Sequence, residues 1–403
     1  MSVRTLVKSI QDIMRQDTGV DGDAQRISQL CWMFFLKIID DQDQELELTR
    51  DGYASPIPAK LQWRNWAADP EGLTGEALMT FINDELFPAL KDLQLTGKPG
   101  DRRRVVRDVF EDAYNYMKSG QLLRQVINKI AQVDFNNLAE RQHFGDIYEQ
   151  ILTDLQSAGN AGEYYTPRAV TAFMVDRIDP HPGEILFDPA CGTGGFLTCS
   201  IRHMRERYVK TPAHEQALQS ALRAVEKKQL PHMLCVTNML LHGIEDPSFV
   251  RHDNTLARPY ISYTQSDRVD IVVTNPPFGG REEDGIESNF PQHFRTRETA
   301  DLFLALIVRL LKTDGRAARW HAVRRGREDA AEGTSDGGVQ PPHHRPPAQF
   351  RIQALCLDRH QLAVLREGRA DQGHLVLRTP LARRPESLFD DQANPVGTFS
   401  ALH

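Results

Sequence analysis

The sequence predicts an α/β protein in which an open, mostly parallel sheet follows an all-helical N-terminal region. Three observations lead to this prediction. Apolar residues recur at helical spacing through much of residues 1–157. A short apolar strand at Ile185–Phe187 runs into a glycine-rich loop and then a helix from about Phe196. A second buried-strand pattern, Val269–Thr274, ends in a loop with two consecutive prolines.

The composition excludes several classes of protein. Of 403 residues, 40% are hydrophobic and 26% are charged, which is too apolar for a disordered chain. No apolar run is long enough to span a bilayer, and no signal peptide is predicted. Five cysteines without a C-x-x-C pair favour a reducing compartment over a disulfide framework or a zinc ribbon. We therefore expect a cytoplasmic protein, without a metal site and not associated with a membrane.

Charge is distributed unevenly along the chain. The formal net charge is −7, yet residues 316–403 contain 13 Arg, no Lys and 10 acidic residues. Residues 1–315 are correspondingly more acidic than the whole. Such a surface repels a phosphate backbone unless a local basic strip or a partner compensates. If the protein acts on nucleic acid, we expect that it does not hold it alone.

The N-terminal region is predicted to consist of helices separated by loops that contain glycine and proline. Residues 2–48 are predicted to be helical, and residues 97–101 break the pattern. A basic cluster at Arg102–Arg107 follows; a solvated helix face is favoured over a DNA contact. A further amphipathic helix is expected at 144–155, followed by a linker at 157–162.

The glycine loop after the first strand predicts a ligand close to the backbone. Gly192, Gly194 and Gly195 lack a Cβ that would keep a ligand away. Their spacing matches neither the phosphate-binding G-x-x-x-x-G-K-[ST] loop nor the dinucleotide G-x-G-x-x-G fingerprint. Glu226, after the apolar residues 222–225, is placed to accept both hydroxyls of a ribose. A plain structural turn is the alternative interpretation.

The loop Asn275-Pro276-Pro277-Phe278 predicts recognition of a planar amine. The two prolines fix the backbone and remove two donors. The Asn275 side-chain carbonyl and the Pro276 backbone carbonyl can then accept both hydrogens of the exocyclic amino group of an adenine. Phe278 can stack on the ring of that base. Such acceptors stabilise the charge that develops when the amine attacks a sulfonium methyl group. A duplex base can reach them only when flipped out, at a cost of roughly a few kcal/mol.

These two loops, in this order, resemble those of the γ-type amino-methyltransferases of DNA. The chain as a whole is similar to the modification subunit of type I restriction–modification systems. Three segments carry this resemblance: Glu163–Arg168, Asp188–Leu197 and Asn275–Phe278. The helical N-terminal domain is also typical of the family, and the resemblance extends from about residue 3 to about residue 318. It implies a Rossmann-like methyltransferase fold that uses S-adenosylmethionine to methylate adenine N6 in DNA.

The resemblance also implies roles for individual residues. Catalytic roles fall on Asn275, Pro276, Pro277 and Phe278. Asp188 belongs to the main cofactor motif, Glu226 to the ribose site, and Asp253 to a position near the cofactor adenine, although an Asp-Asn pair is also a good turn. The remaining implied cofactor contacts are Glu163, Tyr164, Tyr165, Thr166, Pro167, Arg168, Gly192, Thr193, Gly194 and Gly195.

Family members do not choose their DNA site themselves. The resemblance implies a separate specificity subunit that binds two modification subunits, and a restriction and translocation subunit that joins some complexes. The acidic balance of residues 1–315 agrees with this division of labour. The DNA target therefore belongs to another chain.

Beyond Ala318 the family pattern stops. Residues 319–403 contain one isoleucine, no lysine and no tyrosine, which is unusual for the second half of a sheet; a disordered basic linker is one interpretation. We favour a shifted reading frame. One possible set of codons for Trp320–Gly326 is TGG CAC GCT GTT CGG CGA GGG. Read from its second base, this set spells Gly-Thr-Leu-Phe-Gly-Glu-Gly, which resembles the continuation of the family, so the sequence is compatible with a shifted frame.

The predicted domains are therefore a helical domain at 1–157, a methyltransferase domain with a truncated sheet at 158–318, and an aberrant tail at 319–403. A sheet that ends after Val269–Thr274 and the helix at 302–311 would expose an edge. Two functions compete: an active adenine-N6 methyltransferase subunit, and an impaired assembly module that binds the specificity subunit. Cytosine-N4 and protein glutamine methylation use similar acceptor loops, and the long helical domain disfavours the latter.

Overall fold

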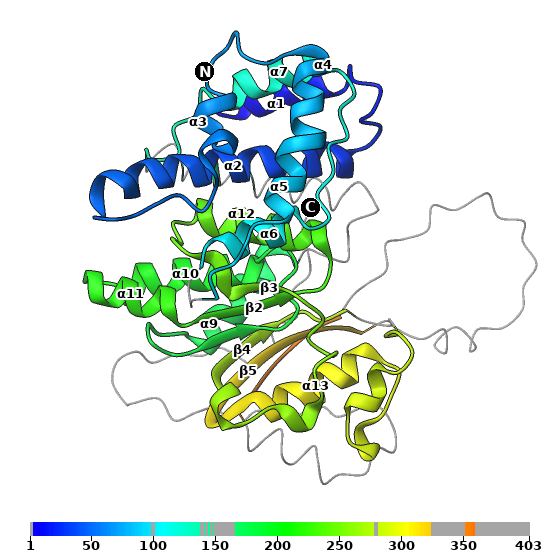
Figure 1. The fold of residues 1–403 in the computed structure, drawn as a ribbon. Helices are drawn as coiled ribbons and strands as arrows, with labels where there is room; N and C mark the ends of the chain where they lie inside the picture. The colour runs from blue at the N-terminus through cyan, green and yellow to red at the C-terminus, as the bar shows by residue number, and fades with distance from the viewer. Residues whose placement is uncertain are drawn as a thin grey trace, which may run out of the picture.

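The computed structural model describes residues 3–97, 101–137, 141, 144–145, 148, 166–277, 281–323 and 351–358. Within them, a helical layer lies above a layer that contains a six-stranded sheet (Figure 1). The predicted α/β fold with a preceding helical region is confirmed. The predicted linker at 157–162 and most of the predicted helix at 144–155 lie outside the described residues.

Residues 2–48 are predicted to be helical, and the described part of this stretch forms two helices of the helical layer. The first helix ends at Met14, and beyond it the Asp17 carboxylate accepts the N–H groups of Gly19, Lys118 and Ser119 at 2.8–2.9 Å. The helical elements of this layer are α1 (Val3–Met14), α2 (Asp23–Thr49), η1 (Ala59–Leu61), α3 (Trp63–Trp66), α4 (Gly75–Thr80), η2 (Phe81–Leu86), α5 (Phe87–Lys91), α6 (Arg103–Phe110) and α7 (Gly120–Ile130).

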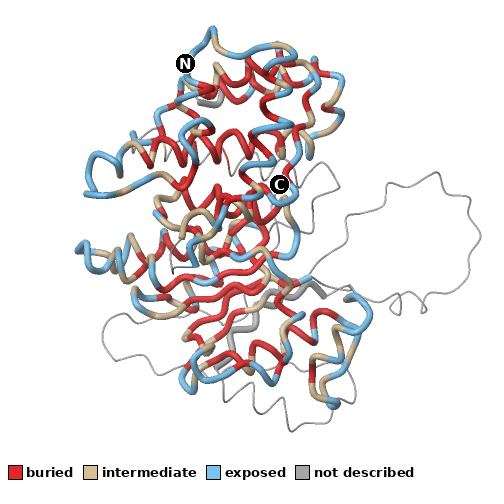
Figure 2. The backbone as a smooth tube through the Cα atoms, viewed as in Figure 1, coloured by how far each residue is buried: buried red, intermediate tan, exposed pale blue. Residues whose placement is uncertain are grey.

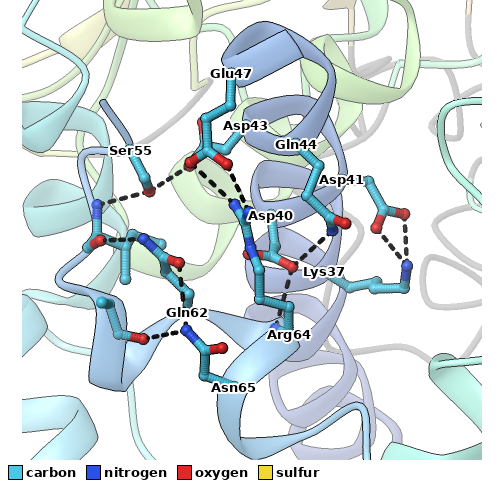
Figure 3. A network of polar contacts seen from close by, with 12 residues as sticks. Lys37, Asp40, Asp41, Asp43, Gln44, Glu47, Ser55, Gln62, Arg64 and Asn65 are labelled. Carbon is cyan, nitrogen blue, oxygen red and sulfur yellow. Dashed lines mark hydrogen bonds and ion pairs between the residues drawn. The ribbon is translucent and has the colours of Figure 1, made fainter. Parts of the chain in front are cut away.

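The second half of α2 carries buried ion pairs as well as apolar residues (Figure 3). Lys37 donates to Asp41 at 2.6 Å, and Arg64 donates to Asp40 at 2.8 Å. Arg102 donates to the buried Asp43 at 2.9 Å. The prediction that the Arg102–Arg107 cluster forms a solvated face is therefore wrong for Arg102, whose side chain is only 12% exposed.

The sheet has the strand order β3-β2-β1-β4-β5-β6. Neighbouring strands are parallel except β5 and β6, which are antiparallel. The order reverses between β1 and β4, and the carboxyl ends of strands at such a switch point form the usual ligand crevice of open α/β sheets. The strands are β1 (Leu186–Asp188), β2 (Leu222–Glu226), β3 (Val250–His252), β4 (Val269–Thr274), β5 (Leu311–Val323) and β6 (Arg351–Asp358).

Helices cover both faces of the sheet. One buried apolar cluster joins α9, α10 and α12 to one face, and a second joins α13 to the other. The helices of this layer are α9 (Arg168–Ile178), α10 (Gly195–Arg207), α11 (Pro212–Ser220), α12 (Gln229–Leu241) and α13 (Thr299–Leu310). Short 3₁₀ turns are η3 (Pro247–Phe249), η4 (Tyr260–Ser262), η5 (Gln265–Asp267), η6 (Ile286–Asn289) and η7 (Gln292–Phe294).

The sheet does not end at β4, so the predicted truncation after this strand is wrong. β5 pairs with β4 in parallel, and β6 pairs with β5 along eight residues. Ion pairs attach β5 to the rest of the domain: Lys312 lies 2.8 Å from Asp270 and Arg316 lies 2.7 Å from Glu184. The earlier expectation rested on the loss of family pattern past residue 318, whereas backbone pairing needs no particular side chains.

The two layers share one interior. The first apolar cluster runs from α1 and α2 through α12 to the sheet, and Figure 2 shows the buried backbone continuing across this boundary. Polar contacts accompany it, since Gln229 of α12 donates to the carbonyls of Asp108 and Val109 at 3.1 and 2.8 Å. No helix in the described part of the chain is long and apolar enough to cross a membrane.

Candidate active site

A cavity of about 250 Å³ lies where β1, β2 and β4 end. Its walls come mainly from the loops that follow the strands, as the switch point predicts. It is lined by Thr166, Pro189, Ala190, Cys191, Gly192, Thr193, Gly195, Phe196, Glu226, Lys227, Lys228, Asp253, Asn254, Thr255, Asn275, Pro277, Arg281, Glu282, Thr299 and Phe303. The glycine loop and the Asn-Pro-Pro loop, separate in sequence, therefore share one cavity.

The glycine loop has the backbone geometry that its sequence requires. Gly192 and Gly194 have φ values of 54° and 84°, in the left-handed region that favours glycine. A Cβ on Gly194 would lie 2.8 Å from Sγ of Cys235 on α12. The loop can therefore turn tightly against α12, and α10 starts at Gly195 with its first turn at the cavity.

Asp188 accepts a hydrogen bond from the segment that leads into the glycine loop and does not line the cavity. Its side chain is fully buried at the end of β1. Burial raises the pKa of Asp188 to about 7, although the N–H of Ala190 donates to Oδ1 at 3.2 Å and favours the ionised form. Asp188 is thus placed to orient the backbone of the loop.

Glu226 ends β2 and faces the cavity through a nearly buried carboxylate. Oε2 accepts the N–H of Gly192 at 2.9 Å, and Oε1 accepts the N–H of Lys228 at 2.7 Å. Burial raises the pKa of Glu226, while these N–H groups lower it. Each carboxylate oxygen can accept a further hydrogen bond, so the pair remains able to bind two hydroxyl groups.

Asn275 lies directly after β4 with its side-chain amide held in one orientation. Nδ2 donates to Oγ1 of Thr166 at 3.0 Å. Oδ1 is buried and has no hydrogen-bond partner among the described residues. A buried unsatisfied carbonyl is costly, so this oxygen marks a place for a donor from a ligand.

Of the predicted site residues that the structure describes, the larger part line one cavity. Glu226, Asp253, Asn275 and the glycine loop surround one cavity. Asp253 is more exposed than the others, at 53% of its side chain. Predicted residues that do not line the cavity are Pro167, Arg168, Asp188, Gly194 and Pro276. Those that lie outside the described residues are Glu163, Tyr164, Tyr165 and Phe278.

Several lining residues had no signal of their own in the sequence. Lys227 and Lys228 follow Glu226 directly, so their position at the end of a strand could have indicated them. Glu282 lies beyond the Asn-Pro-Pro loop, where no motif points to it. Phe303 of α13 reads as an ordinary core residue, and only the packing of α13 beside β5 brings it to the cavity.

The chemistry of this cavity is that of positioning and hydrogen-bond acceptance. Cys191 lines it, but burial raises the pKa of its thiol well above the ordinary value, so the reactive thiolate is not populated. Within the described residues, no group of three or more His, Cys, Asp or Glu side chains is placed to hold a metal ion. Among the described residues, Glu226 and Oδ1 of Asn275 offer hydrogen-bond acceptors to a ligand in the cavity.

Comparisons with known proteins agree with this geometry. The sequence family described as "N-6 DNA Methylase" matches residues 139–321, and the family described as "HsdM N-terminal domain" matches residues 3–130. The chain is 62% identical over 318 residues to the EcoEI type I restriction enzyme methylase subunit of Escherichia coli, covering 79% of this chain and 64% of that protein. It spans about half of the next relative, the StySPI methylase subunit of Salmonella potsdam, at 26% identity.

Solved structures similar to this chain also come from type I restriction systems. The modification subunit of a putative type I restriction enzyme from Vibrio vulnificus YJ016 matches with a TM-score of 0.68 and 42% identity, over 79% of this chain and 70% of that chain. A chain from a type I restriction–modification system, solved in a study of complex assembly and conformational transition, matches with a TM-score of 0.71 and 33% identity, over 79% and 64% of the two chains.

Proposed function

Because this chain belongs to the family of type I restriction–modification methylation subunits, we propose that it methylates DNA. The reaction is transfer of a methyl group from S-adenosylmethionine to N6 of an adenine in duplex DNA. The observation that carries this proposal is the unpartnered Oδ1 of Asn275, buried beside the cavity that Glu226 and the glycine loop surround. An amine of the substrate can supply the hydrogen that this oxygen lacks.

The cavity fits S-adenosylmethionine in three respects. The Glu226 carboxylate retains acceptor capacity for the two ribose hydroxyls. Gly192 and Gly195 let the backbone approach a ligand, and the first N–H groups of α10 favour a carboxylate such as that of the methionine part. Asp253 also lines the cavity, and the family resemblance supports a place for it near the cofactor adenine. When bound, this cofactor supplies an electrophilic methyl group on sulfonium sulfur.

The protein positions the target amine. Oδ1 of Asn275 accepts one N6 hydrogen, and the backbone carbonyl of Pro276 is proposed to accept the other, with Phe278 stacking on the base. Thr166 fixes the Asn275 amide so that Oδ1 and not Nδ2 faces the amine. The resulting acceptors favour the charge distribution of the transition state over that of the free base, which is how preorganised dipoles accelerate a reaction.

The partners follow from the family and from charge. We propose that a specificity subunit selects the DNA site and binds two copies of this subunit, and that a restriction and translocation subunit joins the complex. The excess of acidic residues within 1–315 supports a DNA grip supplied largely by those partners. The cytoplasm, where the DNA substrate lies, is the proposed location.

Transfer of tritium from labelled S-adenosylmethionine to DNA, with a cognate specificity subunit supplied, tests this function. We expect the label at N6 of adenine. Label at N4 of cytosine would instead identify cytosine as the substrate and contradict adenine methylation. An impaired assembly module would bind the specificity subunit without label transfer. The cavity shared by Glu226, Asn275 and the glycine loop supports the active subunit over that alternative.

The domain division is also proposed: helical at 1–157, methyltransferase at 158–318, and a tail at 319–403 read out of frame. The end of the family match at residue 321 supports the last boundary. Sequencing the gene around codon 318 tests it. An intact frame with codons unrelated to the family's continuation would contradict a frameshift.

A further inference from the structure

Glu282 joins three segments that surround the cavity. Its Oε2 accepts from Nζ of Lys227 at 3.1 Å and from Nδ2 of Asn254 at 3.4 Å. Lys227 follows β2, Asn254 follows β3, and Glu282 itself follows the loop after β4. The Glu282 side chain is only 12% exposed, and all three residues line the cavity.

The neighbouring carboxylate provides a contrast within the same ion-pair cluster. Glu283 also pairs with Nζ of Lys227, at 2.9 Å, but its side chain is 73% exposed and does not line the cavity. An exposed ion pair contributes little to stability because water screens it. Removal of a mostly buried carboxylate costs more, because its hydrogen-bond donors lose that acceptor. The two acids therefore have similar partners and different expected importance.

Glu282 lies in the described segment that follows the Asn275–Pro277 loop in the sequence. Asn275 to Pro277 are fixed at one end by β4, and Arg281 forms an isolated antiparallel bridge with Glu298 at the other. The bond from Glu282 to Lys227 adds a direct link from this returning segment to the residue next to Glu226. The segment after the loop and the residue next to Glu226 are thereby connected through one side chain.

We propose that Glu282 is a positioning residue that couples occupancy of the adenosine end of the cofactor cavity to the placement of the Asn275 loop. A ligand that orders Lys227 and Asn254 stabilises their bonds to Glu282, and hence the returning segment. By linkage, the positioned loop raises affinity for the cofactor to the same extent. This inference rests on the proposed function, because it takes S-adenosylmethionine as the ligand of the cavity.

The test uses the full chain, with sinefungin as the probe, and compares Glu282→Ala with the matched control Glu283→Ala. We expect the dissociation constant for sinefungin to rise about tenfold in Glu282→Ala, the scale of a lost hydrogen bond to a charged group, and to change less than about twofold in the control. Amide hydrogen exchange within 281–298 should slow on binding in the wild type and the control but not in Glu282→Ala.

The conservative variant Glu282→Gln, which keeps an acceptor oxygen, is a control for misfolding. It should recover part of the sinefungin affinity and part of the slowed hydrogen exchange. With the specificity subunit present, KM for S-adenosylmethionine should rise more than kcat falls. Equal binding and equal exchange in Glu282→Ala and Glu283→Ala would overturn the coupling while leaving the function intact. Absence of sinefungin binding by the wild type would overturn the function, and the inference with it.

Discussion

Nδ2 of Asn275 donates a 3.0 Å hydrogen bond to Oγ1 of Thr166, 109 positions earlier in the chain. Thr166 lies just before α9, and Asn275 lies just after β4. Because the amide nitrogen is held in this way, the carbonyl oxygen is left as the acceptor beside the cavity. Orientation of the proposed catalytic amide thus depends on a residue outside the catalytic loop.

Replacing Thr166 with valine should reduce methyl transfer without abolishing it. The variant keeps the shape of the side chain but removes the acceptor for Nδ2, so the amide loses its fixed orientation. We expect kcat to fall about tenfold, in line with the value of a well-placed hydrogen bond. Steady-state tritium transfer measures this. Thr166→Ser should restore the rate, and a Thr166→Val enzyme as fast as the wild type would exclude the orienting role.

Replacing Glu226 with glutamine should weaken cofactor binding. A glutamine retains one oxygen, so it cannot accept from both Gly192 and Lys228 and still bind two hydroxyl groups. We expect the dissociation constant for sinefungin, measured by calorimetry, to rise at least about tenfold. Glu215→Gln, at a carboxylate paired with Arg205 away from the cavity, is the matched control and should bind normally. Similar affinities in the two variants would remove Glu226 from the site.

Asp188 predicts a pH dependence of stability. Its pKa is about 7 in the folded protein and about 3.9 in an unfolded chain. The folded state therefore holds the proton more tightly, and the contribution to stability is full below about pH 4 and is lost as pH rises towards about 7. Asp188→Asn removes this loss. Relative to the wild type, its free energy of unfolding should increase by roughly 1.4 kcal/mol per pH unit across that window.

Urea denaturation at several pH values between about 4 and 8 measures the difference between the Asp188→Asn variant and the wild type. Asp176→Asn is a suitable control, since Arg177 and Arg207 lower the pKa of that exposed carboxyl. A free-energy difference for Asp188→Asn that stays constant with pH would contradict the raised pKa of Asp188.

Gly194 should tolerate alanine less well than Gly183. Both have positive φ, at 84° and 95°, so both substitutions carry backbone strain of about 1 kcal/mol. Only at Gly194 would the new Cβ lie 2.8 Å from Cys235 Sγ, while nothing lies within 4 Å at Gly183. We expect Gly194→Ala to lower the free energy of unfolding by roughly 2–4 kcal/mol in total, and Gly183→Ala by about 1 kcal/mol.

The steric part of that loss can be tested separately. Cys235→Ala removes the sulfur that the new Cβ would meet, so the double variant Gly194→Ala/Cys235→Ala should recover part of the loss relative to Cys235→Ala alone. Double-mutant analysis of urea denaturation gives this coupling directly. Purely additive effects would show that the backbone strain accounts for the whole cost.

The features of this chain that follow from its sequence are those that short local segments determine. β1, β2 and β4 were predictable because each is a short apolar run that ends in a polar or glycine-rich loop. The two loops could be paired because parallel strands place their carboxyl ends at one edge of the sheet. Glu226 and Asn275 were predictable as site residues for the same reason, because Glu226 ends a strand and Asn275 directly follows one.

Features that depend on long-range pairing were not predictable in this way. The bond of Arg102 to Asp43 joins residues 59 positions apart, and the basic cluster alone looked solvated. Glu282 acquires its importance from Lys227, 55 positions earlier. β5 and β6 were missed because the family pattern fades at their position, while their pairing is made by the backbone.

The central claim is that the Asn275 side-chain carbonyl accepts the target amine. The most direct test is tritium transfer to DNA by Asn275→Ala, with the specificity subunit supplied and sinefungin binding measured in parallel. We predict that the rate falls by about 10²–10³, as for removal of one preorganised group that stabilises a transition state, with affinity for sinefungin unchanged. Methylation by Asn275→Ala at the rate of the wild type would contradict the account.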